Sequence, residues 1–146
     1  MIIRNNIEIS KPKEIVFPWI AEPEKAMQWQ KNVKSGTIIT KKPEMVGTTF
    51  EEEIEENGKT LKIRGVIKEF KDNRAIGFCL ESKIHTVNVT YSIEENDKIS
   101  TVHADINIKW KFPMSIISIF LGKRIKNNIS KQLGSEFLEL KTLCEA

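Results

Sequence analysis

The sequence predicts an α+β domain in which a curved antiparallel sheet of about seven strands packs against one long C-terminal helix. Two observations lead to this prediction. Apolar residues recur every three or four positions from Met114 to Glu145, which is the spacing of an amphipathic helix. From Lys34 to Phe112 the period changes to two, which indicates successive strands. Short turns between these strands force antiparallel neighbours, and the length of 146 residues suits a single domain that covers 1–146.

Two short helices are expected directly after the first strand. Isoleucines alternate with polar residues from Ile3 to Ile9, which indicates a half-buried strand. Ser10 and then Pro12 mark a helix start, and Pro23 opens a second short helix. Pro18 lies inside the first helix, where it conflicts with regular geometry, so we expect that helix to be short or bent.

Six further strands follow, separated by turns that contain proline, glycine, asparagine or aspartate. The sequence Asn57-Gly58 is a strong signal for a tight hairpin. The expected strands are Gly36 to Lys41, Thr48 to Glu56, Thr60 to Phe70, Ala75 to Glu81, Ile84 to Glu94 and Ile99 to Phe112.

The long helix is expected to be divided. Steps of four residues exceed the helical repeat of 3.6, so the apolar stripe drifts by roughly 200° between Ile117 and Phe137. We therefore expect a break or bend near Gly122, with Met114 to Leu121 as a separate short element. On this hypothesis the residues that face the sheet are Ile129, Leu133, Phe137 and Leu140.

Composition excludes several classes of protein. The net charge is +3 and the lysines are scattered, so we expect no nucleic-acid groove. The sequence lacks a signal-peptide pattern and any apolar run long enough for a membrane span, so we expect a cytoplasmic protein. Cys79 and Cys144 lie far apart without a Cys-x-x-Cys motif, and we expect reduced thiols, no metal site and no cofactor.

The order of these elements resembles that of the START-like superfamily, also called SRPBCC proteins, whose architecture is the helix-grip fold. The resemblance covers essentially the whole chain, and it implies a sheet that grips the long helix around an apolar cavity for a lipid, a polyketide or a similar compound. The segments that resemble those of the superfamily are Ile7-Glu8-Ile9-Ser10 before Pro12, Trp29 after the second helix, Val46-Gly47-Thr48, Ser100-Thr101-Val102 and Leu138-Glu139-Leu140-Lys141.

Side chains on the inward parities of the strands would line such a cavity. They are apolar or aromatic, as a hydrophobic-ligand pocket requires, although the same pattern would also fill a solid core. The expected ligand-binding residues are Trp29, Phe50, Ile54, Leu61, Ile63, Phe78, His85, Val87, Val89, Tyr91, Ile106, Ile108, Trp110, Phe120, Ile129, Leu133 and Phe137.

Three polar residues on inward parities are candidates for catalysis. His85 could orient a ligand oxygen or transfer a proton, or it could simply close the end of its strand. Glu52 could be a buried general base, or it could lie where the sheet edge meets solvent. Tyr91 could donate its hydroxyl to a ligand carbonyl, or it could be a core tyrosine with its hydroxyl at the rim. Proton transfer to a bound carbonyl compound, as in polyketide cyclases, requires these groups to converge.

The segment Met114 to Leu121 carries apolar residues nearly all round the helix. These residues could close the cavity mouth, be covered by loops and small helices, or make a transient membrane or protein contact. Lys123, Arg124 and Lys126 follow directly and would favour acidic lipid, although we expect no stable membrane insertion.

We therefore predict that the chain binds a small hydrophobic molecule without chemistry of its own. One alternative is a cyclase- or dehydratase-like enzyme acting on a polyketide-type carbonyl substrate. Another is an accessory role through protein interaction. A cavity of a few hundred Å³ would favour binding, convergence of the three polar groups would favour catalysis, and an exposed patch at Met114 to Leu121 would favour interaction.

Overall fold

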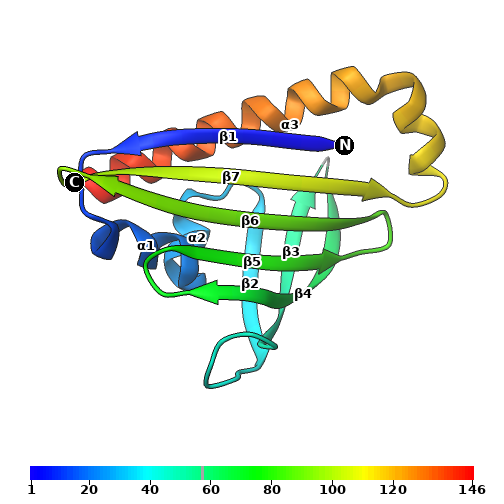
Figure 1. Ribbon diagram of the computed structural model, residues 1–146. Helices are drawn as coiled ribbons and strands as arrows, with labels where there is room; N and C mark the ends of the chain where they lie inside the picture. Colours follow the sequence, from blue (N-terminus) through cyan, green and yellow to red (C-terminus); the bar gives the residue numbers. More distant parts are fainter. Residues whose placement is uncertain (57) are drawn as a thin grey trace.

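The computed structural model describes residues 1–56 and 58–146, and it confirms the predicted architecture. Seven antiparallel strands form one sheet in the order β1-β7-β6-β5-β4-β3-β2, which is the expected meander with the first strand returning beside the last. The long helix α3 runs along the side of the sheet that carries β1 and β7 (Figure 1). The strands are β1 (Ile2–Ile9), β2 (Val33–Thr40), β3 (Thr49–Glu56), β4 (Lys59–Lys71), β5 (Ala75–Glu81), β6 (His85–Asn96) and β7 (Ile99–Trp110). The helices are α1 (Lys13–Ala21), α2 (Pro23–Trp29) and α3 (Met114–Glu145).

The strand boundaries follow the periodicity of the sequence closely. The largest difference is at β2, which begins at Val33 rather than at Gly36. Strands β3 and β4 pair antiparallel as far as Glu56 and Lys59, as a tight hairpin requires, and Gly58 has a positive φ of 75°. Asn57 of the predicted hairpin signal lies outside the described residues.

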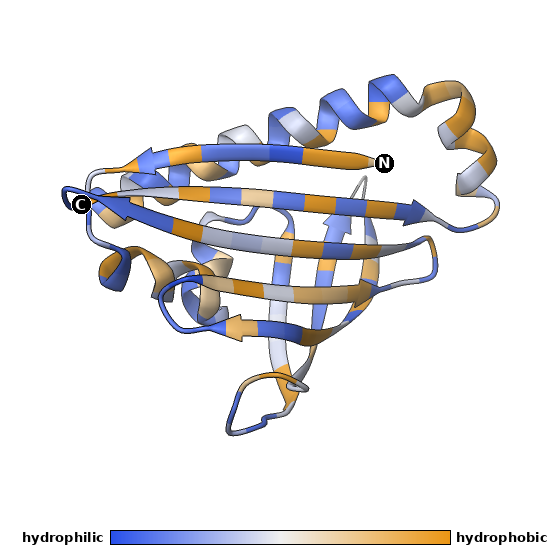
Figure 2. Cartoon of the chain, viewed as in Figure 1, coloured by the Kyte–Doolittle hydropathy of each residue, from blue (hydrophilic) through white to orange (hydrophobic). Residues whose placement is uncertain are grey.

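The predicted inward parities of β6 and β7 are confirmed. Val87, Val89 and Tyr91 on β6 are buried, as are Val102 and Ala104 on β7. Figure 2 shows the alternation of apolar and polar residues along these strands. One face of the sheet therefore packs on the core, while the other carries polar side chains.

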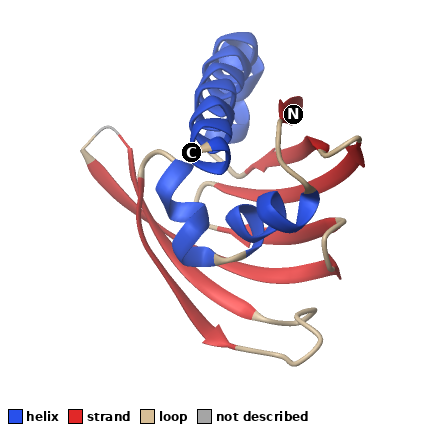
Figure 3. Cartoon of the chain, turned by 90° about the vertical axis from the view of Figure 1, so that its left-hand side faces the viewer, coloured by secondary structure: helices blue, strands red, loops and turns tan. Residues whose placement is uncertain are grey.

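The helices α1 and α2 form an elbow inside the curve of the sheet (Figure 3). Helix α1 continues through Pro18 and is short, as expected for a helix that contains an internal proline. It buries Val16, Phe17 and Ile20, and α2 buries Trp29. The indole nitrogen Nε1 of Trp29 donates a hydrogen bond of 2.7 Å to the carbonyl oxygen of Trp19, which ties the two helices together.

A cluster of aromatic rings fills the space between the sheet, the elbow and α3. Tyr91 lies at its centre, with ring centroids 6.1 Å from Trp29, 6.1 Å from Phe78 and 6.3 Å from Phe137. Phe50 extends the cluster across the sheet, because its ring centroid lies 5.9 Å from that of Phe78. One continuous set of ring contacts therefore joins β3, β5, β6, α2 and α3.

Helix α3 is one continuous helix of 32 residues, so Met114 to Leu121 do not form a separate element, and of the predicted break or bend there is no break. The helix does bend, because its N-terminal part, drawn in yellow in Figure 1, runs in a different direction from the orange and red remainder. The apolar stripe drifts round the helix, and only the C-terminal half keeps it on the core. There Leu133, Phe137 and Leu140 are buried, as predicted.

The two ends of the chain pack against each other. Strand β1 pairs with β7 along its whole length, from Ile2 opposite Asn107 to Ile9 opposite Ser100. The Lys141 ammonium of α3 donates a 2.9 Å hydrogen bond to a backbone carbonyl oxygen of β1. The C-terminal part of α3 is therefore fixed to the first strand.

Gly65 in β4 is the position where packing on the sheet is tightest. It lies opposite Phe50, and an added Cβ would come within 2.2 Å of the Phe50 ring. We expect Gly65→Ala to lower the free energy of unfolding by about 1–3 kcal/mol, because the ring must move and lose its contact with Phe78. Urea denaturation measures this change.

Gly122 provides the matched control. An added Cβ there meets open space, so Gly122→Ala should raise the free energy of unfolding by up to about 1 kcal/mol through helix propensity. Equal effects of the two substitutions would contradict the assignment of Phe50 to the space above Gly65.

Candidate functional site

A small pocket lies between the α1–α2 elbow and the inner face of the sheet. Its volume is about 70 Å³, which is below the roughly 300–1,000 Å³ of pockets that enclose drug-sized ligands. This pocket does not meet the expectation of a few hundred Å³, because the aromatic rings round Tyr91 occupy the space beside α3. Its lining includes Met27 of α2, Ile38 of β2, Phe50 and Glu52 of β3, Phe78 of β5, and Met45 from the loop between β2 and β3.

A larger depression of about 600 Å³ lies on the opposite face of the sheet. Its lining is mostly polar and includes His103 and Asp105, as expected for the outer parity of β7. Arg4 crosses it, and its Nε lies 3.1 Å from Oδ2 of Asp105. Because this surface is polar and open, the smaller apolar pocket is the better candidate for a hydrophobic ligand.

Glu52 is the titratable side chain among the described residues that line the small pocket. It lies on β3 between Gly36 of β2 and Ile63 of β4, so its side chain shares the inner face with Phe50. Gly36 leaves room for it, since an added Cβ there would lie 3.4 Å from Sδ of Met27 and 3.9 Å from Cγ of Glu52. Burial raises the pKa of the Glu52 carboxyl above its usual value.

Tyr91 and Glu136 bring two more ionisable groups to the same interior. Burial is the main reason that the pKa of Tyr91 is raised well above its ordinary range, and the carboxylates of Glu136 and Glu52 raise it further. Burial also raises the pKa of Glu136, while hydrogen bonds to its carboxylate partly offset this effect. Gln132 Nε2 donates one of these at 3.1 Å, and the backbone N–H of Lys31 donates another at 3.4 Å.

Glu136 is the site residue that sequence reasoning missed. It lies three positions after Leu133 and four before Leu140, so helical spacing places it on the buried face of α3. A charged residue on an otherwise apolar stripe is the signal that would have found it. The interior therefore holds two carboxyls on opposite elements with the Tyr91 phenol near both.

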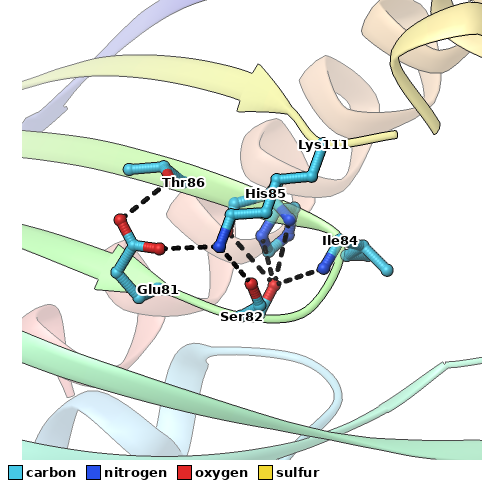
Figure 4. A network of polar contacts seen from close by, with 6 residues as sticks. All are labelled: Glu81, Ser82, Ile84, His85, Thr86 and Lys111. Carbon is cyan, nitrogen blue, oxygen red and sulfur yellow. Dashed lines mark hydrogen bonds and ion pairs between the residues drawn. The ribbon is translucent and has the colours of Figure 1, made fainter. Parts of the chain in front are cut away.

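His85 belongs to a different part of the molecule, the turn between β5 and β6 (Figure 4). Oγ of Ser82 lies 2.8 Å from Nδ1 of His85, and it accepts backbone N–H bonds of 3.2 Å from Ile84 and His85. His85 and Tyr91 lie six positions apart on β6, which corresponds to about 20 Å along the strand. The structure therefore brings Glu52 and Tyr91 to one interior region but does not bring His85 to it.

The contacts around His85 indicate a structural role at the start of β6. Lys111 donates hydrogen bonds of 2.9 Å to Oε2 of Glu81 and 2.8 Å to the carbonyl oxygen of Ser82. The bond from Lys111, followed by that from Thr86, lowers the pKa of the Glu81 carboxyl. The His85 ring also packs on Trp110, with centroids 5.3 Å apart. The buried Nε1 of Trp110 has no hydrogen-bond partner among the described residues.

The other predicted ligand-binding residues fall into four groups. Phe50 and Phe78 line the pocket, and Phe120 is exposed on the surface, so Phe120 does not line an interior cavity. The residues buried in the core are Trp29, Ile63, Val87, Val89, Ile108, Leu133 and Phe137. The half-buried residues are Ile54, Leu61, Ile106, Trp110 and Ile129.

Solved structures share this fold across nearly the whole chain. The protein TTHA0849 of Thermus thermophilus matches with a TM-score of 0.83 and 16% identity, over 99% of this chain and 97% of that one. A START superfamily protein from Mycobacterium smegmatis matches with a TM-score of 0.81 and 15% identity, over 99% and 97%. The Zhui aromatase/cyclase from Streptomyces sp. R1128 matches with a TM-score of 0.80 and 8% identity, over 99% and 93%. These similarities show that the chain has the START-like, helix-grip fold.

Comparisons by sequence add no further relatives. No protein-family model matches the chain, and no curated protein matches it. Among the described residues, no helix is long and apolar enough to cross a membrane, and no group of histidine, cysteine, aspartate or glutamate side chains is arranged to hold a metal ion.

The burial of Glu52 predicts a pH-dependent stability. Because burial raises the pKa in the folded state, the folded chain holds this proton to a higher pH than the unfolded chain does. Stability is therefore lost as the pH rises through the folded-state pKa. We expect Glu52→Gln to match the parent at pH 4 and to be more stable at pH 8, by about 1.4 kcal/mol for each pH unit by which the pKa is raised.

Thermal unfolding of both proteins across this pH range measures the effect. Glu53→Gln is the matched control, because Glu53 follows directly on the same strand and its side chain points to the opposite face. A Glu52→Gln protein that is less stable than the parent at pH 8 would contradict the burial of an uncompensated carboxyl.

Proposed function

We propose that this chain binds a small hydrophobic molecule in the pocket beneath the α1–α2 elbow. The observation that supports this most directly is the composition of the pocket, in which apolar and aromatic side chains surround one half-buried carboxyl, that of Glu52. Hydrophobic pockets with a few convergent polar groups are the usual form of small-molecule sites. The START-like fold of the chain is consistent with this role.

The pocket must widen to accept more than a fragment. Two of its walls are methionines, Met27 and Met45, whose unbranched side chains adapt readily to a ligand. Another wall belongs to β2, an edge strand of the sheet whose pocket residue Ile38 is 39% exposed. We infer that a ligand enters beside Ile38 and displaces these side chains.

The carboxyl groups of the interior determine which charge a ligand can carry. A carboxyl whose pKa is raised is held more readily in its protonated form, which donates a hydrogen bond to a carbonyl or hydroxyl oxygen. A ligand carboxylate would instead lie near Glu52 and Glu136 and be repelled when they ionise. The favoured ligand is therefore uncharged and mostly apolar, with one oxygen that accepts a hydrogen bond.

Catalysis is a second candidate, and the proximity of Glu52 and Tyr91 favours it over a mechanism through His85. Glu52 would remove or return a proton at the carbon next to a ligand carbonyl, and Tyr91 would donate to the carbonyl oxygen. Mass spectrometry of a bound ketone in D₂O tests this role. Deuterium exchange should be lost in Glu52→Gln and retained in His85→Gln, and exchange that depends on His85 would contradict it.

The binding proposal predicts that a larger side chain at Ile38 blocks the pocket. We expect the uncharged fluorescent probe N-phenyl-1-naphthylamine to bind the parent protein. Ile38→Trp should weaken this binding by about tenfold or more, which corresponds to roughly 1.4 kcal/mol, because the indole fills the entrance. Fluorescence titration measures the affinity.

Ile39→Trp is the control, because Ile39 follows on the same strand, is 57% exposed and faces away from the pocket. It should bind the probe as the parent does. Failure of the parent to bind, or equal loss in both variants, would contradict a site at this pocket. Native mass spectrometry of the parent protein from its own source would then show whether any molecule is bound.

A further inference from the structure

The N-terminal part of α3 and the connection before it present an apolar surface that no described element covers. We call this surface the apolar tip and define it as Phe112, Ile116, Ile119 and Phe120. Phe112 and Ile119 are each 78% exposed and Phe120 is 81% exposed. Figure 2 shows this end of α3 as a hydrophobic region at the far end of the molecule from the elbow. Three large apolar side chains this exposed and this close together mark an interaction surface.

The exposed residues of α3 follow the helical repeat. Ile116, Ile119 and Phe120 are spaced by three and four residues and therefore share one face, which points outward. Ser118 lies on the opposite side of the helix and is less exposed, and its hydroxyl donates a hydrogen bond of 2.9 Å to the carbonyl oxygen of Ser115. Ile117 and Leu121 on the other side of the helix are also exposed, at 40% and 48%, so this part of α3 exposes apolar residues nearly all round, unlike a helix that packs only on its own core.

Charge is distributed in a way that identifies the partner. Between Asp105 and Glu136 the sequence contains six lysines and arginines and no acidic residue. The rest of the chain has 17 basic and 20 acidic residues, so the positive charge of the protein is concentrated around the apolar tip. Lys123, Arg124 and Lys126 form the next turns of the helix and are exposed. Basic residues beside exposed apolar ones favour anionic lipid.

We infer that the apolar tip docks on an anionic lipid bilayer. Its apolar side chains would enter the boundary between headgroups and acyl chains, and the three basic residues would contact the headgroups. In Figure 1 this end of α3 bends out of line with the rest of the helix and lies beyond the ends of the strands, at the edge of the molecule, so the surface is accessible while the core stays intact. This inference is independent of the pocket beneath the elbow, because the two surfaces share no residues.

Co-sedimentation with vesicles tests the inference on the full chain. One vesicle preparation contains phosphatidylcholine alone and the other contains in addition about 30% phosphatidylserine. The parent should bind the anionic vesicles more tightly by about tenfold or more, and added salt should reduce this difference. Ile119→Ser with Phe120→Ser should abolish binding. Lys123→Gln, Arg124→Gln and Lys126→Gln together should remove the preference for anionic lipid.

Leu138→Ser is the matched control, because Leu138 lies on the same helix and is 63% exposed but is remote from the basic cluster. It should bind vesicles as the parent does, and circular dichroism should show that all variants keep their helix. Absence of binding by the parent, or equal loss in the control, would overturn the inference. A dimer that dissociates in the Ile119 and Phe120 variant, without vesicle binding, would overturn it in favour of a second copy as the partner.

Discussion

The structure depends on the packing of Tyr91 against rings from three other elements. Trp29 from the elbow, Phe137 from α3 and Phe78 from β5 all contact it, and each comes from a different part of the chain. Aromatic rings bury large areas and prefer edge-to-face and tilted contacts, so such a cluster fixes both distance and angle between layers. It holds the C-terminal half of α3 on the sheet. It also fills the space in which a gripped helix would otherwise border a cavity.

The interior around this cluster contains several ionisable groups. The carboxylates of two residues, Glu52 on β3 and Glu136 on α3, both raise the pKa of the Tyr91 phenol. Glu136 has hydrogen-bond donors from Gln132 and Lys31, whereas burial is the dominant influence on Glu52. The two acids therefore differ in role. Glu136 is anchored between α3 and the segment after α2, while Glu52 lines the small pocket beneath the elbow.

Periodicity predicted the elements well and the site poorly, for one physical reason. Periodicity shows which face of a single element is buried. The faces predicted in this way for β6, for β7 and for the part of α3 with Leu133, Phe137 and Leu140 are confirmed. Whether side chains of different elements meet at one site depends on how those elements are aligned with each other, and periodicity does not show this alignment. The shift in pairing near Ile67 of β4 is one example of such a detail. His85 and Tyr91 lie six positions apart on one strand, so their separation follows from the strand itself, whereas the position of Glu52 relative to Tyr91 depends on the pairing of β3, β4, β5 and β6.

The contact of β1 with β7 and with the end of α3 has a consequence for synthesis of the protein. Strand β1 leaves the ribosome before the other strands of the sheet, yet it pairs with the last of them, and its backbone also accepts a bond from Lys141 of α3. Contacts between residues this far apart in sequence form slowly, because a long loop must close before they stabilise the chain. The strand edge of β1 therefore stays unprotected in the nascent chain until β7 and α3 have been made. During that interval its isoleucines are available to chaperones or to other unfolded chains.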